Sequence, residues 1–176
     1  NNDAASKCFV SALRIDPSYV KAGHRLLDLA EQTGNVEALL LARRSLVGEE
    51  NGRELLATLL VELAEGEAKI LDNMQGLPPT IPEGPELAKE AVELCGDNIT
   101  LKGRALSASG QHTEAVKCWK KIIETDKTNP ESWVGLARAL EAAGDFNTAQ
   151  KCHQKASLLK ENKAATRLPE QPTSAN

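Results

Sequence analysis

The stretch PESWVGLARALEAAGDFNTAQKCHQKASLLKEN, residues 130–162, decides the fold of this 176-residue chain. Its first half places Trp133, Leu136 and Leu140 three to four residues apart, which is the spacing of one face of a helix. The sequence AAGDF follows, and its Gly144 suits the left-handed residue that often ends a helix. The first half therefore predicts one helix that stops at a tight turn.

The second half of the stretch begins with Asp145, a favourable N-cap residue. Ala149, His153 and Ala156 then recur at intervals of three to four residues, again as on a helix. The whole stretch predicts a helix, a turn and a second helix.

The same order of residues occurs 34 positions earlier, in ITLKGRALSASGQHTEAVKCWKKIIETDK, residues 99–127. Cys118 corresponds to Cys152, and a lysine precedes each of them. A third copy of the second helix, AASKCFVSAL, starts at Ala4. Since a single helix pair cannot bury its apolar face alone, a period of this length indicates units that stack on one another.

One unit carries an insertion. The distance from Cys8 to Cys118 is three periods and eight extra residues. The stretch DNMQGLPPTIPEGPE, residues 72–86, holds four prolines and two glycines and cannot continue a helix. We therefore expect an irregular loop near residues 74–85, between the two helices of the third unit.

These units resemble the tetratricopeptide repeat over roughly residues 1–160. The unit that starts near Val20 matches moderately, because Leu39 and Arg43 replace its second-helix alanine and aromatic residue, and the unit near residues 54–95 departs most from the family pattern. The resemblance implies an all-α fold, an α-solenoid of antiparallel helix pairs in a right-handed superhelix, with about four to five repeat units. The matching positions are Trp133, Leu136, Ala137, Leu140, Gly144, Phe146, Ala149 and Ala156 in the last unit, and Ala5, Phe9, Ala12 and Pro17 in a first, partial unit.

The expected domain spans residues 1–161, and the polar stretch 162–176, which contains two prolines, is expected to be a disordered tail. The chain opens with half a unit, so we expect further residues upstream. We also expect an exposed end face, because no apolar-striped capping helix follows the last pair.

Composition and motifs argue against catalysis. The four cysteines lack a C-x-x-C spacing, and no phosphate loop, Gly-x-Ser-x-Gly or His-Glu-x-x-His motif occurs. We therefore expect no enzyme, no catalytic residue, no metal and no cofactor. Cys8, Cys118 and Cys152 are interpreted as packing residues with free thiols, which favours an intracellular, cytoplasmic location. His153 is interpreted as a helix-contact residue.

The distribution of charge and the lengths of the apolar runs argue against two classes of partner, nucleic acid and membrane. Residues 49–97 carry 12 acidic and 3 basic side chains, which argues against nucleic acid. No apolar run approaches the ~18 residues of a membrane span, so no membrane is expected. A protein or peptide partner remains.

The resemblance implies that first helices line a concave groove. A lysine and asparagine pair grips chaperone C-termini in some members of the family. That pair is absent here, so the chaperone function is not expected. The outward positions on the first helices are His24, Asp28, Thr58, Glu62, Thr100, Arg104, Ser107, Val134, Arg138 and Glu141.

Three functions are compatible with these observations. The leading one is a scaffold that binds a peptide or helix in the groove. The alternatives are a self-association module, through the exposed terminal repeat, and a regulatory region of a larger enzyme. Arg104 and Arg138 occupy equivalent positions one period apart, and they are either two solvated arginines or a site for an acidic segment.

Overall fold

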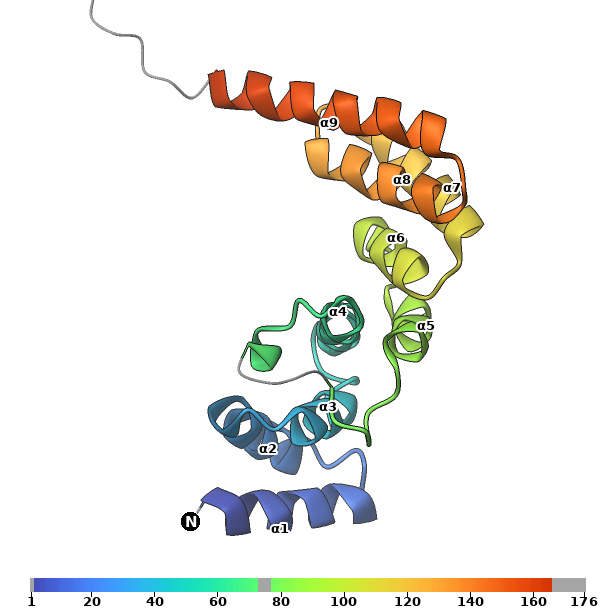
Figure 1. Ribbon diagram of the computed structural model, residues 1–176. Coiled ribbons are helices and arrows are strands. Elements are labelled where there is room, and N and C mark those ends of the chain that lie inside the picture. The colour runs from blue at the N-terminus through green and yellow to red at the C-terminus, as the bar shows by residue number, and fades with distance from the viewer. Residues whose placement is uncertain (1, 73–76, 166–176) are drawn as a thin grey trace, which may run out of the picture. The chain divides into compact units, whose positions relative to one another are not determined.

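The computed structural model describes residues 2–72 and 77–165, and within them every regular element is helical. This confirms the all-α fold class (Figure 1). The described elements are α1 (Asn2–Ile15), α2 (Val20–Thr33), α3 (Val36–Ser45), α4 (Gly52–Glu65), the 3-10 helix η1 (Lys69–Leu71), α5 (Gly84–Leu94), α6 (Ile99–Ala108), α7 (His112–Thr125), α8 (Pro130–Ala142) and α9 (Phe146–Ala165).

The chain divides into two compact units. Unit 1, Asn1–Gln111, contains α1 to α6, and unit 2, His112–Asn176, contains α7 to α9. The repeat pattern groups α6 with α7, yet this division places the two helices in different units.

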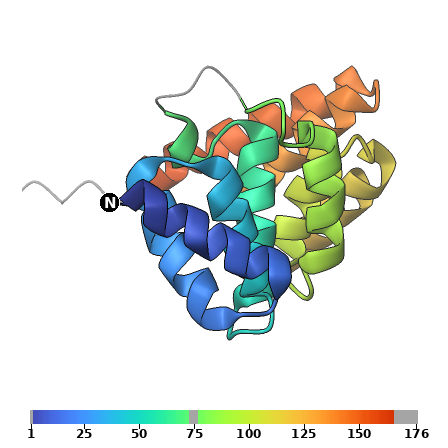
Figure 2. The same cartoon turned by 90° about the horizontal axis from the view of Figure 1, so that it is seen from below.

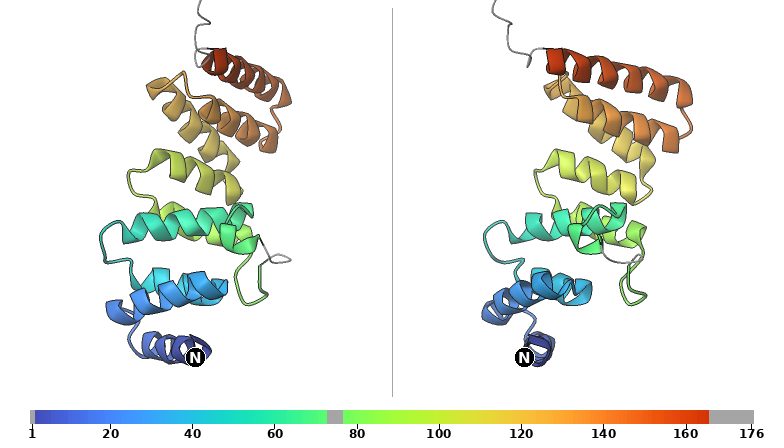
Figure 3. Two further views of the ribbon diagram at one scale, coloured as in Figure 1. Left: turned by 90° about the vertical axis from the view of Figure 1, so that its left-hand side faces the viewer. Right: turned by 60° about the vertical axis from the view of Figure 1, so that its left-hand side comes forward.

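Unit 1 is built from helices that pack on their neighbours in sequence: α1 on α2, α2 on α3, α4 on α5, and α5 on α6. Figure 3 shows these helices as successive layers, and Figure 2 shows α1 lying across α2 and α3. This is the helix-pair repeat that the sequence predicts.

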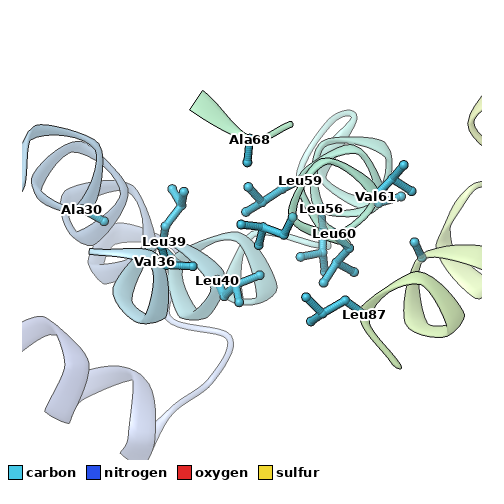
Figure 4. Packing of buried hydrophobic residues seen from close by; sticks show 14 of the residues in the cluster. Ala30, Val36, Leu39, Leu40, Leu56, Leu59, Leu60, Val61, Ala68 and Leu87 are labelled. Carbon is cyan, nitrogen blue, oxygen red and sulfur yellow. The ribbon is translucent and has the colours of Figure 1, made fainter. Parts of the chain in front are cut away.

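The core of unit 1 lies where α3, α4 and α5 meet. Leu40, Leu56, Leu60 and Leu87 are at most 2% exposed, and Figure 4 shows them between the three helices. Small side chains, such as the fully buried Ala57, allow neighbouring helix axes to approach to ~8–10 Å.

The predicted turns are confirmed by their backbone geometry. Gly110 and Gly144 have φ values of 80° and 88°, in the left-handed region that favours glycine. Asp145 accepts a hydrogen bond from the backbone N–H of Thr148 at 3.1 Å, as an N-cap residue does. The boundary between α8 and α9 is therefore set by local sequence.

The insertion lies between α4 and α5, as predicted. Residues 77–83 are irregular, Pro85 stands in the first turn of α5, and residues 74–76 lie outside the described residues. The Thr80 hydroxyl donates a hydrogen bond to the Glu37 carboxylate, and Ile81 packs against the core. The described part of the loop is thus held against α3.

Unit 2 packs α7 and α9 against α8. Trp119 on α7 is only 5% exposed, and Gly135 on α8 lies so close to it that an added Cβ would meet the ring at 2.6 Å. The last helix, α9, runs to Ala165, so residues 162–165 of the expected tail are helical, and residues 166–176 lie outside the described residues.

Candidate functional site

A groove of about 940 Å³ opens on unit 1. Its walls come from the C-terminal end of α2, from α3 and α4, and from the short segment 67–70 that follows α4. The lining residues are Glu31, Gln32, Thr33, Gly34, Leu39, Arg43, Leu55, Thr58, Leu59, Glu62, Glu67, Ala68, Lys69 and Ile70.

The segment 67–70 becomes a wall of the groove because α4 ends in a tight reversal. Gly66 has a φ of 73°, which glycine adopts without strain. The backbone N–H groups of Glu67 and Ala68 both donate to the carbonyl oxygen of Glu62, at 2.8 and 3.1 Å. The chain therefore folds back beside the helix that it has just left.

The floor of the groove is apolar. Leu39 from α3, Leu59 from α4 and Ala68 point toward one another in Figure 4, and none is more than 9% exposed. Leu55 is 45% exposed and Ile70 is half-buried, so these two side chains offer the accessible apolar surface. A partner side chain placed here would lose contact with water against them.

Charged side chains also line the walls of the groove. Arg43 lies 3.5 Å from Glu31 across the α2–α3 pair. Glu62 is half-buried, and within the described residues no cation forms an ion pair with it. The groove thus combines an apolar floor with a carboxylate that forms no ion pair in that part of the chain.

Arg104 lies next to this groove and is already bound. It donates from Nε to Glu65 at 3.1 Å, and its terminal nitrogen lies 3.3 Å from Glu67. The hydrogen bond that Arg104 donates to Glu65 raises the pKa of the Arg104 guanidinium above its usual value, against the opposing effect of partial burial. The guanidinium fork therefore serves a contact within unit 1.

Of the predicted site residues in unit 1, Thr58 and Glu62 line the groove. The others do not line it. His24 and Asp28 are exposed on α2, with His24 at 4.0 Å from Glu49, and Thr100 is exposed on α6. Ser107 is half-buried and donates a hydrogen bond to the Gly103 carbonyl at 2.9 Å.

The remaining predicted residues belong to unit 2. Val134 is half-buried and Arg138 is exposed on α8. Glu141 contacts α9, since Glu141 Oε1 lies 2.9 Å from Nε2 of His153. Within the described residues Arg138 has no ion-pair partner.

The residues predicted from the sequence include neither the accessible apolar side chain of Leu55 nor any residue of the segment 67–70, which contains Ile70. Leu55 stands in the first turns of α4, one helical turn before Thr58, and was not counted among the outward positions. Glu67 and Ile70 come from between the helices, where no repeat position exists. The usable signal was the helix-ending Gly66, followed by the alternating pattern of Ala68 and Ile70.

The four cysteines, all among the described residues, form no disulfide with one another, and three of them are buried. Burial raises the pKa of the Cys152 thiol, which disfavours the reactive thiolate. Cys8 differs from its repeat equivalents because it is exposed. No cluster of three or more metal-ligating side chains occurs in residues 2–72 or 77–165, and no described helix is long and apolar enough to cross a membrane.

Comparison with known proteins finds one matching family model and solved structures with a similar fold. Residues 118–151 match the family model described as tetratricopeptide repeat. One similar structure is titled "Crystal structure of MamA protein", with a TM-score of 0.55, 17% identity, and coverage of 97% of this chain and 89% of that one. Another, "Crystal structure of MamA", has a TM-score of 0.50, 18% identity, and coverage of 93% and 91%. No curated protein matches.

Proposed function

Because residues 118–151 match the tetratricopeptide repeat and the fold is built from helix pairs, we propose that this chain is an interaction scaffold that binds a peptide or helical segment of a partner in the groove of unit 1. Repeats of this family generally mediate protein–protein interaction and are typically non-catalytic. The groove of about 940 Å³, with an apolar floor and polar walls, is the observation that carries the proposal.

The shape of the groove suits a side chain that inserts between two helices. Leu55 and Ile70 line it with accessible apolar surface, while Thr58 and Glu62 supply polar groups from α4. A helix presents apolar side chains every three to four residues, which is how an amphipathic helix occupies a groove of this kind.

Self-association is the less favoured alternative. The exposed side chains along α9 are mostly polar, among them Gln150, Lys151, Gln154 and Lys155. Exposed Phe146 and Leu158 are single apolar residues rather than a continuous patch. Light scattering that finds a stable dimer of the full chain would favour this alternative.

The pairing of Arg104 with Glu65 and Glu67 does not support an acidic ligand in this groove. Arg138 in unit 2 stays a candidate for such a contact. Charge reversal at Arg138 tests this contact separately, through the affinity of the variant for peptides that are selected on the full chain.

The test is selection of a random peptide library on the full chain, followed by fluorescence anisotropy of individual peptides. Peptides that use the groove should lose affinity for Thr58→Trp, which places a bulky ring in it, and for Leu55→Ala, which removes an exposed apolar contact. Circular dichroism verifies that both variants keep the helical fold. Peptides that bind both variants as tightly as the unchanged chain would place the binding surface elsewhere.

A further inference from the structure

We propose that the groove of unit 1 selects a basic amphipathic segment, in which apolar side chains contact Leu55 and Ile70 and a lysine or arginine contacts Glu62. This inference rests on the proposed function and adds the charge of the partner. It reverses the expectation of an acidic segment for this part of the chain.

The C-terminal end of α4 carries a local surplus of negative charge. Glu62, Glu65 and Glu67 lie close enough to Arg104 to act on it, and they outnumber it by three to one. Glu65 and Glu67 bind the guanidinium, whereas Glu62 forms no ion pair within the described residues. The end of a helix adds negative potential, because its last carbonyl groups point outward.

The cations on the groove walls do not cancel this charge. Arg43 is engaged by Glu31, as described above. Lys69 is exposed on the segment after α4 and has no ion pair in the part of the chain that the structure describes. When Arg104 and Glu65, which lie beside the groove, are included, the carboxylates outnumber the cations by four to three. The carboxylates are those of Glu31, Glu62, Glu65 and Glu67, and the cations are Arg43, Lys69 and Arg104.

The unit that surrounds the groove is also acidic. Residues 1–111 contain 17 acidic and 11 basic side chains, and residues 49–97, which supply α4, the segment 67–70 and α5, contain 12 and 3. A surplus of one sign attracts ligands of the opposite sign and raises their association rate. A basic partner is therefore drawn to the unit that holds the groove.

Apolar and acidic side chains lie close together on one face of α4. Thr58 and Glu62 are one helical turn apart, and so are Leu55 and Thr58, so all three share a face of α4. An apolar contact at Leu55 and an ionic contact at Glu62 then suit one peptide about two turns long on that face. Lysine and arginine fit best, because their long stems cover apolar surface while the charge reaches the carboxylate.

The experiment uses the peptides selected on the full chain, restricted to those that lose affinity for Thr58→Trp. Their sequences should be enriched in Lys and Arg relative to the starting library. Glu62→Lys should weaken their binding about tenfold and reduce its salt dependence. Glu50→Lys is the matched control, since Glu50 is exposed near the opposite end of α4 and should change affinity less than about twofold.

The outcomes separate the two proposals. Groove-dependent peptides that are neutral or acidic, or that bind Glu62→Lys as tightly as the unchanged chain, would overturn the basic-segment inference and leave the groove as a binding site. An absence of groove-dependent peptides would overturn both. Equal effects of Glu62→Lys and Glu50→Lys would show general charge attraction and remove Glu62 from the site.

Discussion

Arg104 on α6 and Glu65 at the end of α4 are 39 residues apart in the chain and form an ion pair, with Arg104 Nε 3.1 Å from Glu65 Oε2. The pair joins two helices of unit 1 beside the groove. It converts an arginine that was a candidate for ligand binding into a structural contact. It also leaves the neighbouring carboxylate of Glu62, like Lys69, without an ion pair on the groove wall within the described residues.

Replacing Arg104 with glutamine should affect both stability and binding. The ion pair is partly exposed, so its loss should lower the free energy of unfolding by no more than about 1 kcal/mol. The released carboxylates should make basic groove peptides bind more tightly, by about two- to fivefold. Urea titration and fluorescence anisotropy measure the two effects, and Arg25→Gln, an exposed change on α2, is the control. Weaker binding of basic peptides to Arg104→Gln would contradict the charge assignment.

The close approach of Gly135 to Trp119 should make Gly135→Ala destabilising in unit 2. An added Cβ would meet the indole ring at 2.6 Å, so the ring or α8 must shift. Overpacking of this kind costs about 1–3 kcal/mol. Gly48→Ala provides the comparison, because a Cβ there would meet no atom within 4 Å. Chemical denaturation followed by tryptophan fluorescence measures both, and equal stability of the two variants would refute the predicted clash.

The core of unit 1 should depend on Leu60, which is fully buried. Leu60→Ala removes most of that side chain and leaves a cavity, which should cost about 2–5 kcal/mol of unfolding free energy. Leu158→Ala removes the same atoms from a side chain that is 56% exposed, so its effect should stay within about 0.5 kcal/mol. The pair is compared by urea titration, and a loss at Leu60 no larger than at Leu158 would be inconsistent with the described core.

The thiols should differ in reactivity according to burial. Cys8 is exposed, while Cys95, Cys118 and Cys152 are buried, so a thiol reagent should label one cysteine of the native chain rapidly. Cys8→Ser should abolish that rapid phase, and denaturant should expose the other three. Rapid labelling that persists in Cys8→Ser would show that a second thiol is accessible in the native state.

Stability of unit 2 should fall in acid partly because of Asp145. Hydrogen bonds from Thr148 hold the pKa of this carboxyl below its usual 3.8. The folded state therefore binds the proton less readily, so its stabilising effect is present above pH 3.8 and is lost as pH falls through the lower folded value. Asp145→Asn keeps a capping side chain without a titrating group and should flatten this part of the profile. Thermal unfolding as a function of pH tests it, and an unchanged acid slope would rule Asp145 out.

How far the sequence predicts the molecule depends on the distance over which each interaction acts. The helix pair α8 and α9 could be predicted because Gly144 and Asp145 set its turn locally. The insertion before Pro85 could be predicted because proline cannot continue a helix. The pairing of Arg104 could not, since inspection of helix neighbours reaches only three or four residues, and Glu65 comes from another helix.

The sequence by itself determined the helices, their turns and their assembly into repeated pairs, because hydrophobic period and turn chemistry act within one or two helical turns. It also located Thr58 and Glu62 on an outward face of α4. Only the tertiary structure decided which of the outward residues line one groove. That choice depended on the reversal after Gly66, which brings Ile70 back beside α4, and on the ion pair that occupies Arg104. Both bring together groups from different elements, and a local pattern carries no information about such contacts.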